Sequence, residues 1–467
     1  MTPPRVAPRL VLDRSVRTFR GGTVLVGGHP GRLITLNADG VNALSLLLEG
    51  RPSTDAARSL GQRLVRTGMA HPTANTNGRP SDIGRQVTVV VPVRDRSRSL
   101  DRCLASLGGH QPVVVVDDGS DDPAAVAEVC ERRGAHVIRR HVNGGPGAAR
   151  NEGMALVRSE LVAFVDSDCT VGEGWLDGLV WMFEDPGVGA VAPRVRPEWT
   201  GSRSARSRFS EDHSSLDMGP EPSEVGPDRV VRYVPTTALV MRTSAWDKGF
   251  DTDLRVGEDV DLVWRLLDAG WRIRYQPAVT VRHREPSSWA SLMARRFRYG
   301  TSAGPLARRH PDRLAPLELR PWPTAAVVAL LGGTPALGLA MIVASATAIA
   351  RRVHRHGIPF VLTLRWSAEG AGWTMVGVGR AATMLVAPAL VVTAVRSKRT
   401  AAALAFLVIL PPTVEWWQRR PRLDPVRWSL ASIADNVAYG AGVWSGCLRA
   451  GTLAPLLPSL LFARTSE

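Results

Sequence analysis

The stretch from Val87 to Val195 constrains the fold more than any other part of the chain, because it alternates Val-rich apolar runs with segments of helical spacing. The runs are VTVVVPV, PVVVV, AHVIR, LVAFV and VGAVAPRV, and the helical segments lie near residues 98–106, 123–133, 146–158 and 175–184. Continuous apolar runs joined by helices predict a mostly parallel sheet buried on both faces. The predicted fold class is therefore α/β, in which ligands bind beyond the carboxyl ends of the strands.

The net charge of +15 does not indicate a nucleic-acid partner, because the basic residues are nearly all scattered Arg, with Lys248 and Lys398 the lysines. Arg residues gather at 351–355 and 419–422, beside apolar runs, which favours a membrane surface with anionic lipids as the partner. The four cysteines have no metal-like spacing and indicate a reducing compartment. Residues 1–20 contain no apolar run typical of a secretory signal.

Residues 1–80 are expected to form a small α+β domain. The segments VRTFRGGTVLVGGHP and GRLITLN predict short strands broken by glycine pairs. ADGVNALSLLLEG predicts a helix that ends at Gly50, and a second helix follows with Ser53 or Thr54 as its cap. The polar segment HPTANTNGRPSDIGRQ then predicts a linker to the next domain.

Residues 322–467 are expected to form an apolar helical region associated with the membrane. Thr324 to Ala350 contains no charged residue and is long enough to span a bilayer. Gly332, Gly333 and Pro335 interrupt this run, so a bent or re-entrant helix is one interpretation. Ala381 to Val395 and Ala401 to Val414 are apolar but short for full spans. The alternative is an apolar bundle that lies on the membrane or in a dimer.

Acidic residues follow the predicted strands of the α/β region. Asp117 and Asp118 end the run VVVV and precede Gly119, which indicates either a nucleotide contact through carboxylate acceptors or a turn with a helix cap. Asp166 and Asp168 end the run LVAFV. Two carboxylates in this Asp-x-Asp spacing can face one point, and hard divalent cations prefer oxygen ligands. The sequence is compatible with two interpretations of this segment, a metal site and a polar turn.

The segment NGGPGAARNEG, at 143–153, indicates an anion site or a glycine-rich turn. Its glycines let the backbone approach a ligand closely. Pro146 can open the following helix, whose N-terminal amides favour an anion. Arg150 stands one turn into that helix, where it can meet a phosphate or a base edge. The alternative for Arg150 is a surface position.

The C-terminal part of the α/β region, VGEDVDLVWRLLDAGWRIRYQPAVTVRH, carries a second group of candidates. Glu258 and Asp259 precede an amphipathic helix, where the helix dipole is expected to keep carboxylates ionised. An ionised carboxylate beside an acceptor hydroxyl is a general base. His283 is a candidate metal ligand at a strand end, although a lone His is more often structural. The later segment ARRFRYG offers arginines as phosphate clamps.

In their order along the chain these residues resemble the family 2 glycosyltransferases with the GT-A fold, a Rossmann-like fold, over residues 85–312. The resemblance implies an inverting transfer of a hexose from a nucleotide sugar, with Mg²⁺ or Mn²⁺ as the divalent cation. The residues that it assigns to nucleotide-sugar binding are Pro92, Asp95, Asp117, Asp118, Arg150, Asp166, Arg295 and Arg298. It assigns metal binding to Asp166, Asp168 and His283, and base catalysis to Asp259 with Glu258 beside it.

The whole chain is similar to the mycofactocin-system glycosyltransferases. In that resemblance residues 1–80 are similar to the winged-helix-like peptide-binding chaperone of the pyrroloquinoline quinone pathway, so a precursor peptide is an expected partner. The implied donor is UDP-glucose, the linkage β-1,4, and the acceptor a peptide-derived redox cofactor. The implied location is the cell membrane, with the catalytic domain on the cytoplasmic side. No Gln-x-x-Arg-Trp motif follows His283, which argues against a processive polysaccharide synthase.

Three other functions stay open on the sequence alone. The apolar tail is compatible with a glycosyltransferase that acts on a lipid or polyprenyl acceptor. A non-catalytic scaffold that recruits a precursor peptide through residues 1–80 is disfavoured by the complete set of acidic motifs. A nucleotidyltransferase is disfavoured because no early Gly-rich Lys/Arg signature is present. The polar segment from Glu198 to Asp228 is predicted to be a loop that closes over the donor sugar or shapes the acceptor site.

Overall fold

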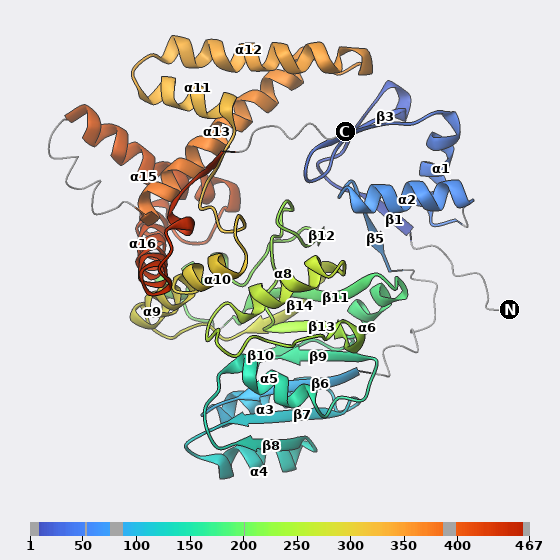
Figure 1. Ribbon diagram of the computed structural model, residues 1–467, viewed down its shortest axis with the longest axis vertical. Helices are drawn as coiled ribbons and strands as arrows, with labels where there is room; N and C mark the ends of the chain where they lie inside the picture. The colour runs from blue at the N-terminus through green and yellow to red at the C-terminus, as the bar shows by residue number, and fades with distance from the viewer. Residues whose placement is uncertain (1–8, 52–53, 75–86, 200, 386–397, 461–467) are drawn as a thin grey trace. The chain divides into compact units, whose positions relative to one another are not determined.

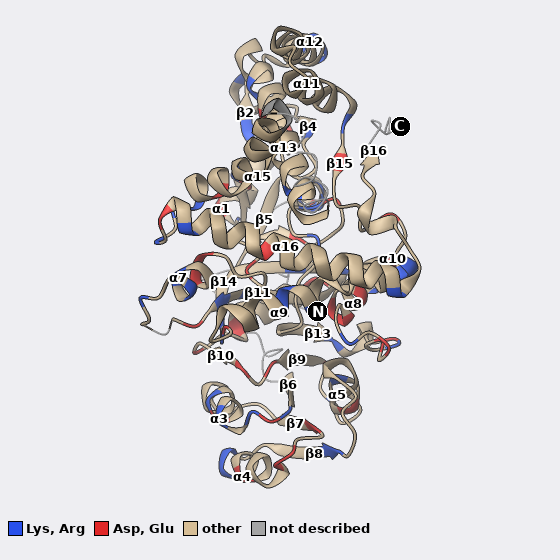
Figure 2. Ribbon diagram, turned by 90° about the vertical axis from the view of Figure 1, so that its left-hand side faces the viewer, with Lys and Arg blue, Asp and Glu red and all other residues tan. Residues whose placement is uncertain are grey.

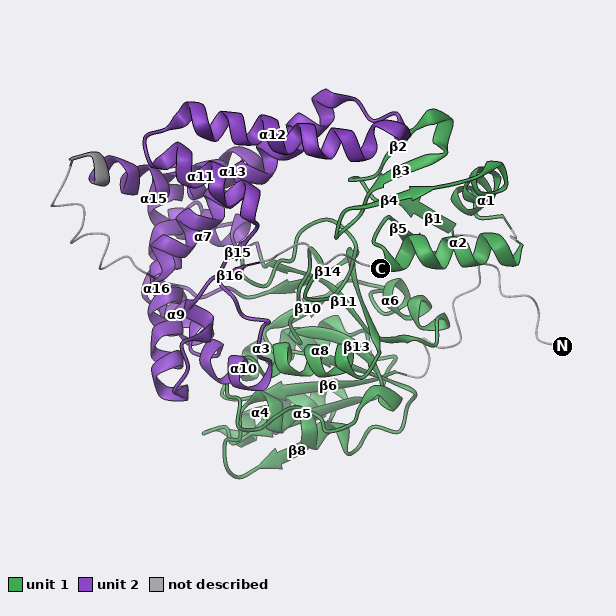
Figure 3. Ribbon diagram, turned by 45° about the horizontal axis from the view of Figure 1, so that its top comes forward, with its two compact units in different colours: residues 1–198, 214–284 green, residues 199–213, 285–467 purple. Residues whose placement is uncertain are grey.

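The computed structural model describes residues 9–51, 54–74, 87–199, 201–385 and 398–460. The chain divides into two compact units, which are shown in different colours in Figure 3. Unit 1 comprises residues 1–198 and 214–284, and unit 2 comprises residues 199–213 and 285–467. The predicted linker at 75–86 and much of the apolar run from Ala381 to Val395 lie outside the described residues.

A nine-stranded sheet forms the centre of unit 1 (Figure 1). Its order is β10-β14-β11-β13-β9-β6-β7-β8, and β12 pairs with β14. The strands are β6 (Val87–Val93), β7 (Val113–Asp118), β8 (His136–Arg140), β9 (Leu161–Val165), β10 (Cys169–Val171), β11 (Val188–Pro197), β12 (Ser223–Glu224), β13 (Ala238–Arg242) and β14 (Arg272–His283). The five strands expected from the Val-rich runs are therefore all present.

The sheet is mixed rather than mostly parallel. Strands β9, β6, β7 and β8 are parallel neighbours, as predicted, and so are β11 and β14. β13 is antiparallel to both β9 and β11, and β10 is antiparallel to β14. The antiparallel strands lie in one half of the sheet, so the carboxyl ends of β6, β7 and β9 still share one edge.

Helices cover both faces of this sheet. They are α3 (Ser97–Ser106), α4 (Pro123–Arg133), α5 (Pro146–Met154), α6 (Asp177–Val180) and α8 (Glu258–Asp268). On one face Leu100 of α3 and Val126 of α4 are buried in a cluster with Val89 and Val91. On the other face α5 approaches so closely that a Cβ on Gly153 would lie 2.5 Å from Val90. Alternate residues of β6 thus pack on the two faces, which explains why this strand is buried at every position.

The N-terminal part of unit 1 is a small α+β structure. β1 (Arg9–Leu12) pairs with β5 (Ala70–Thr73), and β2 (Arg17–Phe19), β3 (Val24–Gly27) and β4 (Arg32–Thr35) form a second sheet. Its two helices are α1 (Ala38–Glu49), which ends at Gly50 with φ of 72°, and α2 (Asp55–Arg66). Thr54 caps α2 by accepting a hydrogen bond from Ala57 N at 3.3 Å. These helix ends agree with the sequence predictions.

Unit 2 is largely helical. Its elements are α7 (Ala205–Asp212), α9 (Trp289–Gly300), α10 (Ala303–Arg309), β15 (Glu318–Leu319), α11 (Pro321–Leu331), α12 (Pro335–Val353), α13 (Phe360–Leu385), α15 (Lys398–Arg419), α16 (Pro425–Ala450) and β16 (Ser459–Leu460). The apolar run from Thr324 to Ala350 is divided between α11 and α12 by a break at Gly332–Thr334, so it is not one continuous span. Figure 2 shows α11 and α12 with little charge along most of their length.

Two described helical segments of unit 2, Pro335–His356 and Ala401–Arg419, are long and apolar enough to cross a membrane. This criterion rests on length and composition alone, and little of either segment is buried within the structure.

The segment from Glu198 to Asp228 is more ordered than the predicted polar loop. Residues 199–213 leave unit 1 and form α7 in unit 2, where Arg206 donates to the carbonyl of Pro286 at 2.6 Å. The chain then returns to unit 1, where β12 extends the sheet beside β14. The segment therefore contains a helix and a strand.

Candidate active site

The edge of the sheet where β6, β7 and β9 end carries most of the predicted site residues. Pro92 lies within β6, buried, beside Val116 of β7. Asp95 follows β6 in a left-handed conformation, with φ of 53°. Its carboxylate accepts a hydrogen bond from Asp121 N at 2.7 Å, and its own N–H donates to Ser120 Oγ at 2.9 Å. The loops that follow β6 and β7 are thus held together.

Asp117 and Asp118, at the end of β7, are both buried and differ in their contacts. Asp117 accepts from Ser120 N at 2.9 Å and closes the turn after β7. Asp118 accepts from the amides of Gly144 and Gly145, at 2.9 and 2.7 Å, and from Arg140 Nε at 2.9 Å. The Asp118 carboxylate therefore fixes the glycine-rich turn that precedes α5.

Arg150 lies at the centre of the site, and its burial excludes the alternative of a surface arginine. It is 3% exposed. Its Nη2 donates to Asp166 Oδ1 at 2.6 Å and its Nη1 to Glu258 Oε1 at 3.1 Å. Burial by itself would lower the pKa of Arg150, but the charges of Asp166 and Glu258 outweigh it and raise the pKa. The ring of Phe250 packs 5.3 Å from the guanidinium carbon.

Glu258 and Asp259 are the first residues of α8, and burial opposes the ionisation that the helix dipole was expected to favour. Burial, together with the charge of Asp259, raises the pKa of Glu258 to about 7. Burial also raises the pKa of Asp259, against the opposing hydrogen bond from Val260 N. Desolvation thus exceeds the stabilisation that a helix N-terminus provides. A carboxylate whose pKa is raised toward neutrality is better suited to general-base catalysis.

Asp168 and His283 are neighbours across β10 and β14. Cys169 of β10 pairs with His283 in antiparallel register, and His283 Nε2 lies 3.7 Å from Asp168 Oδ1. Arg96 also forms an ion pair with Asp168. Asp166 is turned toward Arg150 instead. Within the described residues, no group of three or more His, Cys, Asp and Glu side chains is arranged as a metal site.

The donor types nevertheless fit a divalent cation. Asp168 supplies a carboxylate, which suits both Mg²⁺ and Mn²⁺, and His283 supplies an imidazole at the same position, a ligand type of transition metals. Arg96, which pairs with Asp168, has a side chain that is 58% exposed. A cation at Asp168 would take the place of this exposed guanidinium.

Arg295 and Arg298 belong to α9 of unit 2. Arg295 is buried and ion-paired with Glu285. Arg298 is exposed. Their predicted contact with a nucleotide sugar stays a prediction.

Comparison with known proteins identifies the family. The sequence profile described as glycosyl transferase family 2 matches residues 88–248. A pre-mycofactocin glycosyltransferase of Mycobacterium tuberculosis is 36% identical over 96% of this chain and 97% of its own length. The chain belongs to the mycofactocin-system family 2 glycosyltransferases.

Two more distant proteins are similar to parts of this glycosyltransferase. The glycosyltransferase AglE of Haloferax volcanii is 24% identical over 46% of this chain and 71% of its own length. The solved structure of a mannosyltransferase from Pyrobaculum calidifontis, in complex with GDP-Man and Mn²⁺, is 20% identical with a TM-score of 0.38, and the match covers 64% of this chain and 86% of that one.

The profile match of this glycosyltransferase ends before the second group of site residues. It includes Asp95, Arg150, Asp166 and Asp168 but stops short of Glu258. The structure joins the two groups through the contact between Arg150 and Glu258. That contact could not be inferred from the order of the motifs alone.

Two residues contribute to the site although the sequence patterns did not predict them. Arg96, next to Asp95 in the segment VRDRS, forms the ion pair with Asp168, and its place just after a strand was the available signal. Asn151 exchanges two hydrogen bonds with the backbone of Phe250, Nδ2 donating to its O at 2.9 Å and Oδ1 accepting from its N at 2.8 Å. No sequence pattern indicated this second contact.

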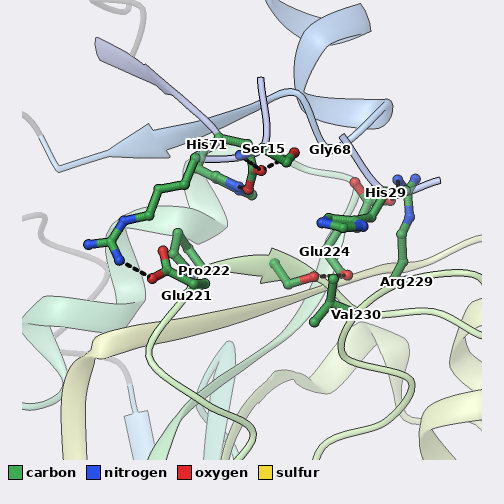
Figure 4. Close-up of a pocket in the computed structure, with 12 residues that line it drawn as sticks. Ser15, His29, Gly68, His71, Glu221, Pro222, Glu224, Arg229 and Val230 are labelled. Atoms are coloured by element: carbon green, nitrogen blue, oxygen red, sulfur yellow. Dashed lines mark hydrogen bonds and ion pairs between the residues drawn. The ribbon is translucent and has the colours of Figure 1, made fainter. Parts of the chain in front are cut away.

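Unit 1 also contains a pocket of about 180 Å³ between its N-terminal part and the segment around β12 (Figure 4). His71 Nε2 lies 2.8 Å from Asp13 Oδ2, and both residues line the pocket. Arg229 donates to the carbonyl of His29 at 2.5 Å. Burial would raise the pKa of Asp13, but its hydrogen bonds, first that with His71, lower it overall. The pocket therefore holds an ionised carboxylate.

Proposed function

We propose that this glycosyltransferase moves a hexose, glucose from UDP-glucose, to a peptide-derived redox cofactor in mycofactocin biosynthesis, with inversion and in β-1,4 linkage. The observation that carries the proposal is the buried contact of Arg150 with both Asp166 and Glu258, which joins the residues after β9 to the start of α8. The 36% identity to the pre-mycofactocin glycosyltransferase supports the acceptor class.

In the proposed reaction Asp259 is the general base. Its carboxylate takes the proton of an acceptor hydroxyl while that oxygen attacks the anomeric carbon of the donor. The bond between this carbon and the diphosphate oxygen breaks on the opposite face, which inverts the anomeric centre. The proton remains on Asp259, and the raised pKa of this residue favours its acceptance.

The other residues hold the donor. Asp95 and Asp117, at the ends of β6 and β7, would bind the nucleotide, and Arg150 would keep the Asp166 carboxylate in place. Asp168 and His283, with Asp166, would hold Mg²⁺ or Mn²⁺. The cation, when bound, supplies charge neutralisation for the diphosphate leaving group.

The experiment that tests the donor compares UDP-glucose, UDP-galactose, UDP-N-acetylglucosamine and GDP-mannose on detergent-purified protein, with Mn²⁺, with Mg²⁺ and with a chelator. Binding or hydrolysis of UDP-glucose that disappears with chelator is the expected result. Preference for another sugar would replace the proposed donor. No response to any donor would support the non-catalytic scaffold, which is also testable in cells as unimpaired function of Asp168→Ala.

A lipid or polyprenyl acceptor is a second candidate, favoured by one observation. Pro335–His356 and Ala401–Arg419 are apolar and little of either segment is buried within the structure, which supports a location at the cell membrane. In this proposal the catalytic domain lies on the cytoplasmic side. Extraction of cells that express the protein separates the two acceptors. Labelled glucose in the aqueous phase supports the peptide-derived acceptor, and label in the organic phase supports the lipid.

We also propose that the N-terminal part of unit 1 contacts a precursor peptide. The pocket whose lining includes Asp13, His71 and Glu224 supports this, because the side chains of these residues can bond to the backbone donors and acceptors of a peptide. Binding of a peptide that is weakened by His71→Ala and retained by Asp259→Asn is the expected result. Equal peptide binding by His71→Ala and Asp259→Asn would mean that the peptide does not bind in this pocket.

A further inference from the structure

Helix α16 of unit 2 packs on its neighbours through small residues. It contacts α9, α10, α13 and α15. A Cβ on Gly442 would lie 2.0 Å from the carbonyl oxygen of Phe297, and one on Gly446 would lie 2.3 Å from that of Thr301. The glycines therefore allow the helix backbones to touch, as small residues do in membrane helix pairs. This face of α16 is therefore buried against the neighbouring helices of unit 2.

The outer face of α16 is apolar along most of its length. Every residue exposed between Trp428 and Leu448 is Ala, Leu, Val or Trp. These residues, here called the α16 stripe, are Leu430, Ala434, Val437, Ala441, Trp444 and Leu448. They follow one another in steps of four and three residues, which places them in one row along the helix. Leu430 is 64% exposed and Leu448 is 70% exposed.

We propose that the α16 stripe lies in a membrane surface rich in anionic lipid, with the helix parallel to the bilayer plane. The proposal deepens the proposed function, because it rests on the membrane as a partner and names the element that contacts it. An apolar helix face that enters the boundary of headgroups and acyl chains is the usual way in which a helix lies on a membrane.

Positive charge and tryptophan beside the stripe match an anionic surface. Arg427, at the start of α16, and Arg422, just before it, have side chains that are each 71% exposed. Arg449 is exposed at the far end of the stripe. Before α16 the exposed ring of Trp417 lies 5.2 Å from the guanidinium carbon of Arg420. Trp and Arg are enriched at the membrane–water interface, where anionic headgroups attract the cations.

The composition of α16 favours a position in the plane over a span. Helix α16 is not one of the described helices that are long and apolar enough to cross a membrane. It contains Asp435, which is buried and ion-paired with Arg296 at 2.8 Å. A second copy of the chain fits the stripe less well, because the positions that flank it, such as Ile433, Ala438 and Ser445, have no charges to select a partner helix.

The test uses the full chain in vesicles of phosphatidylcholine and phosphatidylglycerol. The native cysteines are buried, so an NBD fluorophore can be attached to an introduced cysteine in Val437→Cys, with Glu173→Cys, an exposed position of unit 1, as the matched control. Quenching by nitroxide lipid and resistance to iodide are expected at 437, and the reverse at 173. Leu430→Cys and Leu448→Cys are expected to be quenched most by the same shallow nitroxide.

Each other result overturns the proposal. Iodide quenching at 437 equal to that at 173 would mean that the stripe faces water. Protection from both quenchers would mean that protein covers it, a second copy above all. A difference in depth between 430 and 448 would mean that α16 crosses the bilayer. Donor turnover is measured on the same labelled samples, so loss of turnover with shallow quenching intact would contradict the proposed function and leave this inference standing.

Discussion

Arg150 and Glu258, which are 108 residues apart in the chain, meet in a buried ion pair at 3.1 Å. The same guanidinium binds Asp166 at 2.6 Å. One side chain of α5 thus connects the end of β9 to the first turn of α8. Because Asp259 follows Glu258 directly, the position of the proposed base depends on Arg150.

Replacement of Arg150 by Ala is expected to weaken both folding and donor binding. It leaves the buried Glu258 and the partly buried Asp166 without their counter-charge, which costs on the order of 3 kcal/mol of unfolding free energy. Arg150→Lys is the matched control, since it keeps the charge but cannot bind two carboxylates as a planar fork. The order of Tm in detergent should be wild type, then Lys, then Ala. Equal Tm for Ala and wild type would contradict the assigned contact.

Replacement of Asp259 by Asn should abolish transfer while donor binding is kept. The amide has the shape of the carboxylate but cannot take the acceptor proton, and a general base contributes roughly 10²–10⁴-fold to a rate. Calorimetric titration with UDP-glucose and product formation with the acceptor measure the two steps separately. Transfer at the wild-type rate in Asp259→Asn would rule out this residue as the base.

The parallel half of the sheet and its carboxylates were predictable from sequence, because they depend on local pattern. A Val-rich run such as β6 can be buried at every position only when both faces of the sheet are covered. The acids that follow β7 and β9 then share one edge by topology. The ends of α1 and α2 were predictable for the same reason, since Gly50 and Thr54 act within one turn.

The remaining features depend on contacts between distant segments. β13 lies between β9 and β11 and is antiparallel to both. It comes after residues 199–213, which belong to unit 2, and the local sequence pattern does not predict that the chain passes into unit 2 and back. The raised pKa of Glu258 depends on burial, which opposes the helix dipole and exceeds it. The position of a residue at a helix N-terminus can be predicted from the sequence, but the desolvation of its side chain depends on the tertiary fold.

The pH dependence of transfer should reflect the carboxylates at the start of α8. Burial raises the pKa of Asp259 above its ordinary value, and of Glu258 to about 7, so the rate should fall as the pH is lowered toward values at which a typical Asp is still ionised. In Glu258→Gln the repulsion between the two charges is gone, so Asp259 should lose its proton at lower pH. The acid limb of the pH–rate profile should therefore move to lower pH. An unmoved limb would mean that another group controls it.

Asn151 should act as a positioning residue for the base. Its amide donates to and accepts from the backbone of Phe250, in the segment that leads to α8. Asn151→Asp keeps the size of the side chain but sets a carboxylate oxygen against the Phe250 carbonyl, so this segment should shift. Because Asn151 is bonded to the segment that leads to α8 and the proposed base, kcat should fall several-fold with little change in KM for UDP-glucose.

The acid limb of the pH–rate profile separates this positioning role from a general loss of folded protein. A shift of the segment before α8 changes the surroundings of Asp259, so the limb should move in Asn151→Asp, whereas a smaller folded fraction lowers the rate equally at every pH. The control is Arg158→Ala, at an exposed position just after α5, which should leave both kcat and the pH profile unchanged. A lower kcat in Asn151→Asp with an unmoved acid limb would assign Asn151 to folding alone.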